Sequence, residues 1–76
     1  MLPRMPAPID DIELAATLAM ALNAEPGMPR SILVDVSRGV VTLEGDADVY
    51  QRAAAERLVR AFTGVKDVVN AIRATA

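Results

Sequence analysis

The feature that most constrains this chain is a pair of β-type runs joined by a short turn. Residues 32–36 and 40–44 are rich in valine, isoleucine and leucine, and Ser37-Arg38-Gly39 lies between them. Valine and isoleucine favour strands, and glycine reaches the left-handed backbone region that a tight turn needs, so the stretch predicts an antiparallel hairpin. Period-two alternation assigns to its core face the residues Ile32, Val34, Val36, Val41 and Leu43.

Two further segments have the spacing of amphipathic helices. The first covers about residues 11–23, behind a plausible N-cap at Asp10. The second begins with Asp48 and Gln51, which have the spacing of a capping box, and stops near Gly64. The apolar stripes are Leu14, Ala15, Leu18, Ala21 and Leu22 in the first helix, and Ala55, Leu58, Val59 and Phe62 in the second.

A third β-type run at residues 67–74 completes the order αββαβ. Seventy-six residues allow one domain with a single small core. The economical packing is an α+β fold, a two-layer sandwich in which a three-stranded mixed sheet carries both helices on one face. We expect this domain to cover residues 10–75. Residues 1–9 contain Pro3, Pro6 and Pro8, which predict a flexible arm.

Composition argues against catalysis. The chain has no cysteine and no histidine, so it lacks a thiol nucleophile, thiolate ligands and the commonest general base. The carboxylate pairs Asp10 with Asp11 and Asp46 with Asp48 lie at helix starts, where capping explains them. We therefore expect no enzyme activity, no cofactor and no metal site. A net charge of -2, one Phe, one Tyr and no Gly-x-x-Gly loop also argue against nucleic-acid binding.

The uncovered face of the sheet is a first candidate partner surface. If Val68 and Ile72 point inward, alternation places on this face the apolar residues Leu33, Val40, Val69 and Ala71. We expect them to form an apolar stripe rimmed by Asp35, Thr42, Glu44 and Arg73, and such a stripe is typical of an interaction site. The alternative is that these are scattered apolar residues of an ordinary protein surface.

The outer side of the first helix is a second candidate. It carries Ile12, Ala16, Ala19 and Met20, and only Glu13 and Thr17 are polar between Ile12 and Leu22. A helix that is apolar nearly all round is usually covered on both sides, which predicts a second contact surface. The alternative is that alanine, a strong helix former, simply tolerates exposure.

At this point the sequence resembles a known family. The run Gly39-Val40-Val41-Thr42-Leu43-x-Gly45, followed by Gly64-Val65-x-x-Val68-x-Asn70-x-Ile72, is similar to the BON domain of bacterial osmotic-shock and nodulation proteins. The resemblance extends from about residue 10 to residue 74. It implies the αββαβ fold and a non-catalytic module, common in envelope, periplasmic or membrane-associated proteins, that binds phospholipid or mediates protein contacts.

A basic cluster is the candidate for phospholipid head groups. It consists of Arg52, Arg57, Arg60 and Lys66. Glu56 and Asp67 interleave with it, so an ion-paired, solvated helix face is the favoured alternative. Asn70 shares a face with the inward residues of the third strand, and we expect its amide to tie that strand to a neighbouring loop or strand end.

The sequence thus predicts a non-catalytic binding module that docks on a protein or a phospholipid membrane in a bacterial cell. The alternative is a homo-oligomerisation or scaffold module that uses the apolar first helix and the open sheet face. The first residues lack the continuous apolar segment of a secretory signal, so we expect a cytoplasmic location for the chain as written. As a fragment of a longer chain, it would be periplasmic or envelope-associated.

Overall fold

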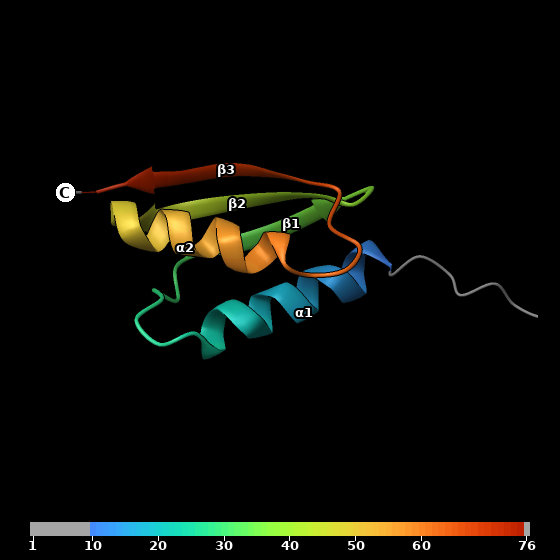
Figure 1. The fold of residues 1–76 in the computed structure, drawn as a ribbon, viewed down its shortest axis with the longest axis horizontal. Helices are drawn as coiled ribbons and strands as arrows, with labels where there is room; N and C mark the ends of the chain where they lie inside the picture. The colour runs from blue at the N-terminus through green and yellow to red at the C-terminus, as the bar shows by residue number, and fades with distance from the viewer. Residues whose placement is uncertain (1–9, 76) are drawn as a thin grey trace, which may run out of the picture.

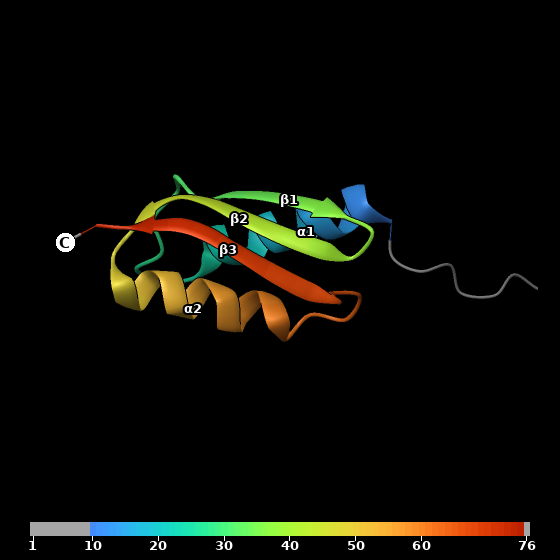
Figure 2. The same cartoon turned by 90° about the horizontal axis from the view of Figure 1, so that it is seen from above.

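The computed structural model describes residues 10–75 and has the expected α+β architecture. The elements are α1 (Asp11–Ala24), β1 (Leu33–Ser37), β2 (Val40–Ala47), α2 (Val49–Arg60) and β3 (Asp67–Ala74). The sheet order is β1-β2-β3, with β1 antiparallel and β3 parallel to β2. Both helices lie on one face of this mixed sheet (Figures 1 and 2). The arm expected at residues 1–9 lies outside the described residues.

Local capping explains where the helices begin. The Asp10 carboxylate accepts the amide of Ile12 at 3.1 Å. At α2, Asp48 accepts the Gln51 amide at 2.7 Å and the Gln51 side chain accepts the Asp48 amide at 2.9 Å, which confirms the capping box. The last helical residue is Arg60, so α2 ends before Gly64 and the glycine belongs to the turn that follows.

The hairpin turn is fastened to the start of α1. Arg38 and Gly39 have φ angles of 53° and 81°, as a two-residue primed turn requires. The Asp11 carboxylate accepts the amide of Arg38 at 2.8 Å and that of Gly39 at 3.2 Å. The expectation that Asp11 serves only as a helix-start residue is therefore incomplete, because its side chain joins α1 to the hairpin.

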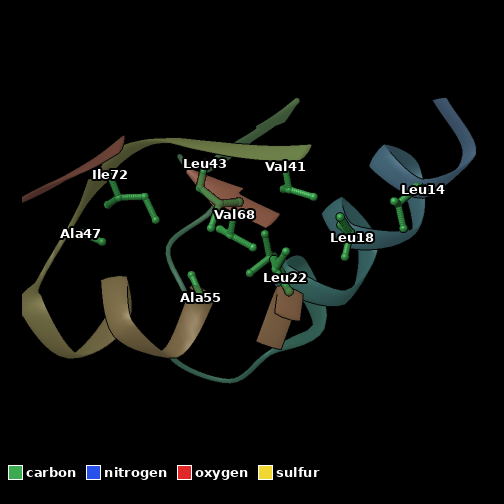
Figure 3. Close-up of a cluster of buried hydrophobic side chains, with 10 residues drawn as sticks. Leu14, Leu18, Leu22, Val41, Leu43, Ala47, Ala55, Val68 and Ile72 are labelled. Carbon is green, nitrogen blue, oxygen red and sulfur yellow. The ribbon is translucent and has the colours of Figure 1, made fainter. Parts of the chain in front are cut away.

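The core lies between the helices and the sheet, and Figure 3 shows its side chains gathered there. Its largest fully buried members are Leu14, Leu18, Leu43, Val41 and Val59, and it is completed by Leu22, Ala47, Ala55, Val68 and Ile72. Full burial of each such Leu or Val side chain contributes roughly 1.5–3 kcal/mol. Val34 and Val36 of β1, and Ile32 just before this strand, are partly buried against this core, which confirms the expected alternation.

One position in β2 allows no side chain. Gly45 has a φ angle of 127°, and a Cβ atom there would lie 2.6 Å from the carbonyl oxygen of Ser31. The Ser31 hydroxyl also donates to the carbonyl of Asp46 at 3.3 Å, so the segment before β1 lies directly against β2 at this point. Glycine is required both by the backbone conformation and by this close approach.

Candidate functional site

The strand order changes the expected pattern of the open sheet face. Because β2 is central, Thr42 lies between Asp35 of β1 and Val69 of β3. In the next row, Glu44 lies between Leu33 and Ala71. Thr42 and Glu44 therefore occupy the middle of the face, whereas the sequence predicted them at its rim. Leu33 lies on one outer strand and Val69 and Ala71 lie on the other, so Thr42 and Glu44 interrupt an apolar stripe across the sheet. The fourth candidate, Val40, lies in a third row at one end of β2.

The same face is acidic. Alternation places Glu44 and Asp46 on it from β2, Asp35 from β1 and Arg73 from β3. The Arg73 guanidinium is 3.9 Å from the Asp46 carboxylate, which leaves Asp35 and Glu44 without a basic partner among the described residues. A shallow hollow on this face is lined by Glu44, Gly45, Asp46, Ala71 and Arg73. These charges favour a cationic ligand over an anionic one.

The outer side of α1 keeps its apolar character in the structure. Ile12 and Met20 are 79% and 71% exposed, and Ala16 between them is also exposed. Residues spaced by four lie in one row along a helix, so these side chains form a continuous strip, which we call the α1 strip. Ala19, the fourth candidate, is partly buried and lies beside this strip.

The four basic candidates do not form one free surface. Arg52 donates to the main-chain carbonyls of Ile72 at 2.9 Å and Asn70 at 3.0 Å. Arg60 is paired with Glu56 at 3.1 Å and lies 3.6 Å from Asp67. Only two of the four, Arg57 and Lys66, have side chains without an ion pair or hydrogen bond to the part of the chain that is described.

Asn70 joins β3 to α2. Its amide nitrogen donates to the Arg52 carbonyl at 3.0 Å and to the Glu56 carboxylate at 3.1 Å, and its oxygen accepts the amide of Ile72 at 3.3 Å. The expected link to a loop or strand end is wrong, because α2 lies along this edge of the sheet. Arg52 and Asn70 thus form a reciprocal pair, which the residue spacing within each segment does not predict.

The family model of the BON domain matches residues 10–76, which include the whole αββαβ unit. The chain belongs to the BON domain family. BON domains are small binding modules and are generally non-catalytic. A comparison with curated proteins found no match.

The residues that carried the resemblance have physical roles in this BON domain. A Cβ at Gly39 would lie 2.9 Å from the Lys66 side chain and 3.2 Å from the Gly64 carbonyl, so the turn and the segment before β3 approach each other closely. Lys66 also donates its amide to the Gly39 carbonyl at 2.8 Å. Like Gly45 and Asn70, these positions therefore join neighbouring segments of the fold.

Other kinds of site find no support in the described part of this BON domain. Residues 10–75 contain no group of three or more potential metal-ligating side chains. No helix among them has the length and apolar character needed to cross a membrane.

The Glu56 carboxyl couples the stability of the domain to pH. Two hydrogen bonds lower the pKa of Glu56 below its ordinary value. The one from Arg60 has the larger effect and the one from Asn70 the smaller. A carboxyl with a lowered pKa stabilises the fold at pH values above its ordinary pKa of about 4.3. This contribution is lost as the pH falls through the lowered pKa. We expect the melting temperature of wild type to exceed that of Glu56→Gln at neutral pH and the difference to close in acid. A difference that stays constant across thermal melts from neutral to strongly acidic pH would contradict this role.

Proposed function

We propose that this BON domain is a non-catalytic module that docks onto a partner protein in a bacterial cell through the α1 strip. The supporting observation is the exposure of Ile12 and Met20, at 79% and 71%, in one row with Ala16. Large apolar side chains that gather on one face of a small protein are typical of interaction sites. Anchors at this helical spacing also match the way an amphipathic helix fits an apolar groove.

The rest of α1 holds this strip rigid. Leu14, Leu18 and Leu22 are buried on the opposite side of the helix, at most 3% exposed, and they fix its rotation about its own axis. Asp11 fixes the start of the helix against the hairpin turn. A preorganised surface loses less conformational entropy on binding, which supports a docking role for this face.

An anionic phospholipid surface has less support as the partner. Two of the four candidate head-group residues, Arg52 and Arg60, already bind groups of the domain itself. On the uncovered sheet face, Asp35 and Glu44 have no basic partner among residues 10–75, and the chain has a net charge of -2. Attraction to anionic lipid depends on clustered basic residues, and the remaining pair, Arg57 with Lys66, is weak in comparison.

Site-specific photocrosslinking in the source bacterium tests the proposal. We expect a photoreactive residue at Met20 to give discrete protein adducts and one at Ala53, an exposed position on α2, to give none of the same species. Ile12→Lys in the first variant should abolish the adducts, because a charge in an apolar contact weakens binding by about tenfold or more. Identical adducts from both positions, or none from Met20, would contradict the proposal.

The same variants separate the other partners. Flotation with vesicles that contain anionic phospholipid tests whether the partner is a membrane. Vesicle binding that is lost in Arg57→Glu and kept in Ile12→Lys would identify lipid, and not a protein, as the partner. Self-association is the second candidate, because the small Ala16 between Ile12 and Met20 lets two copies of α1 approach closely. A dimer in sedimentation equilibrium that Ile12→Lys dissociates would favour it, and a monomer at every concentration would exclude it.

A further inference from the structure

The two edges of the sheet differ in how their main-chain groups are satisfied. At the outer edge of β3, the amide of Val68 donates to the Asp67 carboxylate at 2.8 Å and that of Ile72 to the Asn70 side chain at 3.3 Å. Arg52 donates to the outward carbonyls of Asn70 and Ile72. Figure 2 shows α2 running along this side of β3. With these four groups occupied and α2 alongside, this part of the edge is closed to a further strand.

The outer edge of β1 is open. In a two-residue hairpin the residues that flank the turn, here Ser37 and Val40, form a hydrogen-bonded pair, and such pairs alternate along the ladder. The main-chain groups of Val34 and Val36 therefore point away from β2. No hydrogen bond from another element reaches these groups within residues 10–75. In Figure 2, β1 lies on the opposite side of the sheet from α2.

Side chains beside this edge define the strand that would fit. On the open face lie Asp35 and, in the neighbouring strand, Glu44, both without a basic partner in the described chain. On the helix face, Val34 and Val36 are partly buried against the core. An added strand would therefore be stabilised by basic side chains on the open face and by apolar side chains on the helix face.

A second copy of the chain fits this edge poorly. Antiparallel pairing of two β1 strands over the full length Leu33–Ser37 would place Asp35 directly opposite Asp35 of the other copy. Like charges in directly opposed positions destabilise a strand pair. The charge pattern thus selects against self-pairing and favours a heterologous partner.

We propose that the open edge of β1 accepts an extended segment of a partner protein in which basic and apolar residues alternate, with a lysine or arginine opposite Asp35. The added strand extends the sheet, and its main-chain groups bind those of Val34 and Val36. This surface shares no residue with the α1 strip. The two proposals can therefore fail independently.

Amide hydrogen exchange with short peptides of fixed pattern tests the proposal. The probes are two blocked peptides of equal length, one of alternating valine and lysine and one of alternating valine and glutamate. We expect the lysine peptide to slow exchange at the amides of Val34 and Val36 and the glutamate peptide to have no effect. Asp35→Lys should reverse the preference, with the dissociation constant of the lysine peptide raised about tenfold or more by the reversed charge. Asp35 is exposed, so melting temperature serves as the check that this variant folds.

Three results would overturn the proposal. The first is that wild type binds the two peptides with equal affinity, or that one peptide binds wild type and Asp35→Lys with equal affinity. The second is protection that spreads over the open sheet face and leaves the amides of Val34 and Val36 unchanged. The third is protection of these two amides in wild type alone as its concentration rises, which would assign the edge to a second copy of the chain.

Discussion

Gly45→Ala is expected to lower the free energy of unfolding by about 2–5 kcal/mol, a large part of the roughly 4–11 kcal/mol typical of a domain this size. The φ angle of 127° is strained for any residue with a side chain, and the new methyl group would meet the Ser31 carbonyl oxygen at 2.6 Å. Neither atom can yield alone, because Ser31 belongs to the main chain that leads into β1. Urea denaturation followed by circular dichroism measures the loss.

Gly27→Ala is the matched control for this experiment. Gly27 also has a positive φ angle, of 80°, but no atom lies within 4 Å of the position that a Cβ would take. This variant should lose only the backbone strain, about 1–2 kcal/mol. If both variants lost the same stability, the close approach of Ser31 to β2 would have no energetic consequence and our account of Gly45 would be wrong.

Asn70→Ala is expected to reduce stability by about 1–3 kcal/mol, which corresponds to a fall in melting temperature of about 5–15 °C. The substitution removes hydrogen bonds to the Arg52 carbonyl, the Glu56 carboxylate and the Ile72 amide. It also leaves the outward amide of Ile72 without its acceptor, so the sealed edge of β3 is opened. Thermal denaturation measures the effect.

Asn23→Ala provides the comparison for this variant. Asn23 is exposed near the end of α1, and its side chain has no hydrogen bond with the described part of the chain. Its removal should change the melting temperature little, because surface substitutions of this kind usually lie within about 0.5 kcal/mol. An Asn70→Ala protein with unchanged stability and impaired partner binding would show that Asn70 has a binding role and not the structural one assigned to it.

Period-two alternation and capping residues were sufficient to predict the elements of the fold. The inward positions of β1 and β2 follow because successive side chains of a strand point alternately to the core and to solvent. Val41 and Leu43, both 0% exposed, are examples. The capping box at Asp48 and Gln51 is equally local, because its partners are three residues apart. Interactions of such short range are visible in a sequence.

Strand order and long-range hydrogen bonds were not predictable in the same way. The alternation of β2 is the same whether it lies at the centre or at an edge, so Thr42 and Glu44 could not be placed in the middle of the open face. Arg52 has the helical spacing of an outer ion-pair row, yet its partners are main-chain carbonyls of β3. The candidate lipid surface therefore lost Arg52 to contacts that only the folded arrangement creates, whereas the pairing of Arg60 with Glu56 four residues away is local.

The central position of β2 also predicts the order in which the other two strands pair with it during folding. Its pairing with β1 closes across the two-residue turn at Arg38 and Gly39, whereas its pairing with β3, which joins Val40 to Asp67, encloses the whole of α2. Short closures cost less chain entropy and form faster than long ones, so we expect the hairpin to precede the docking of β3. Because β3 follows the other four elements of the domain in the sequence, the sheet is completed only after almost the entire domain has left the ribosome.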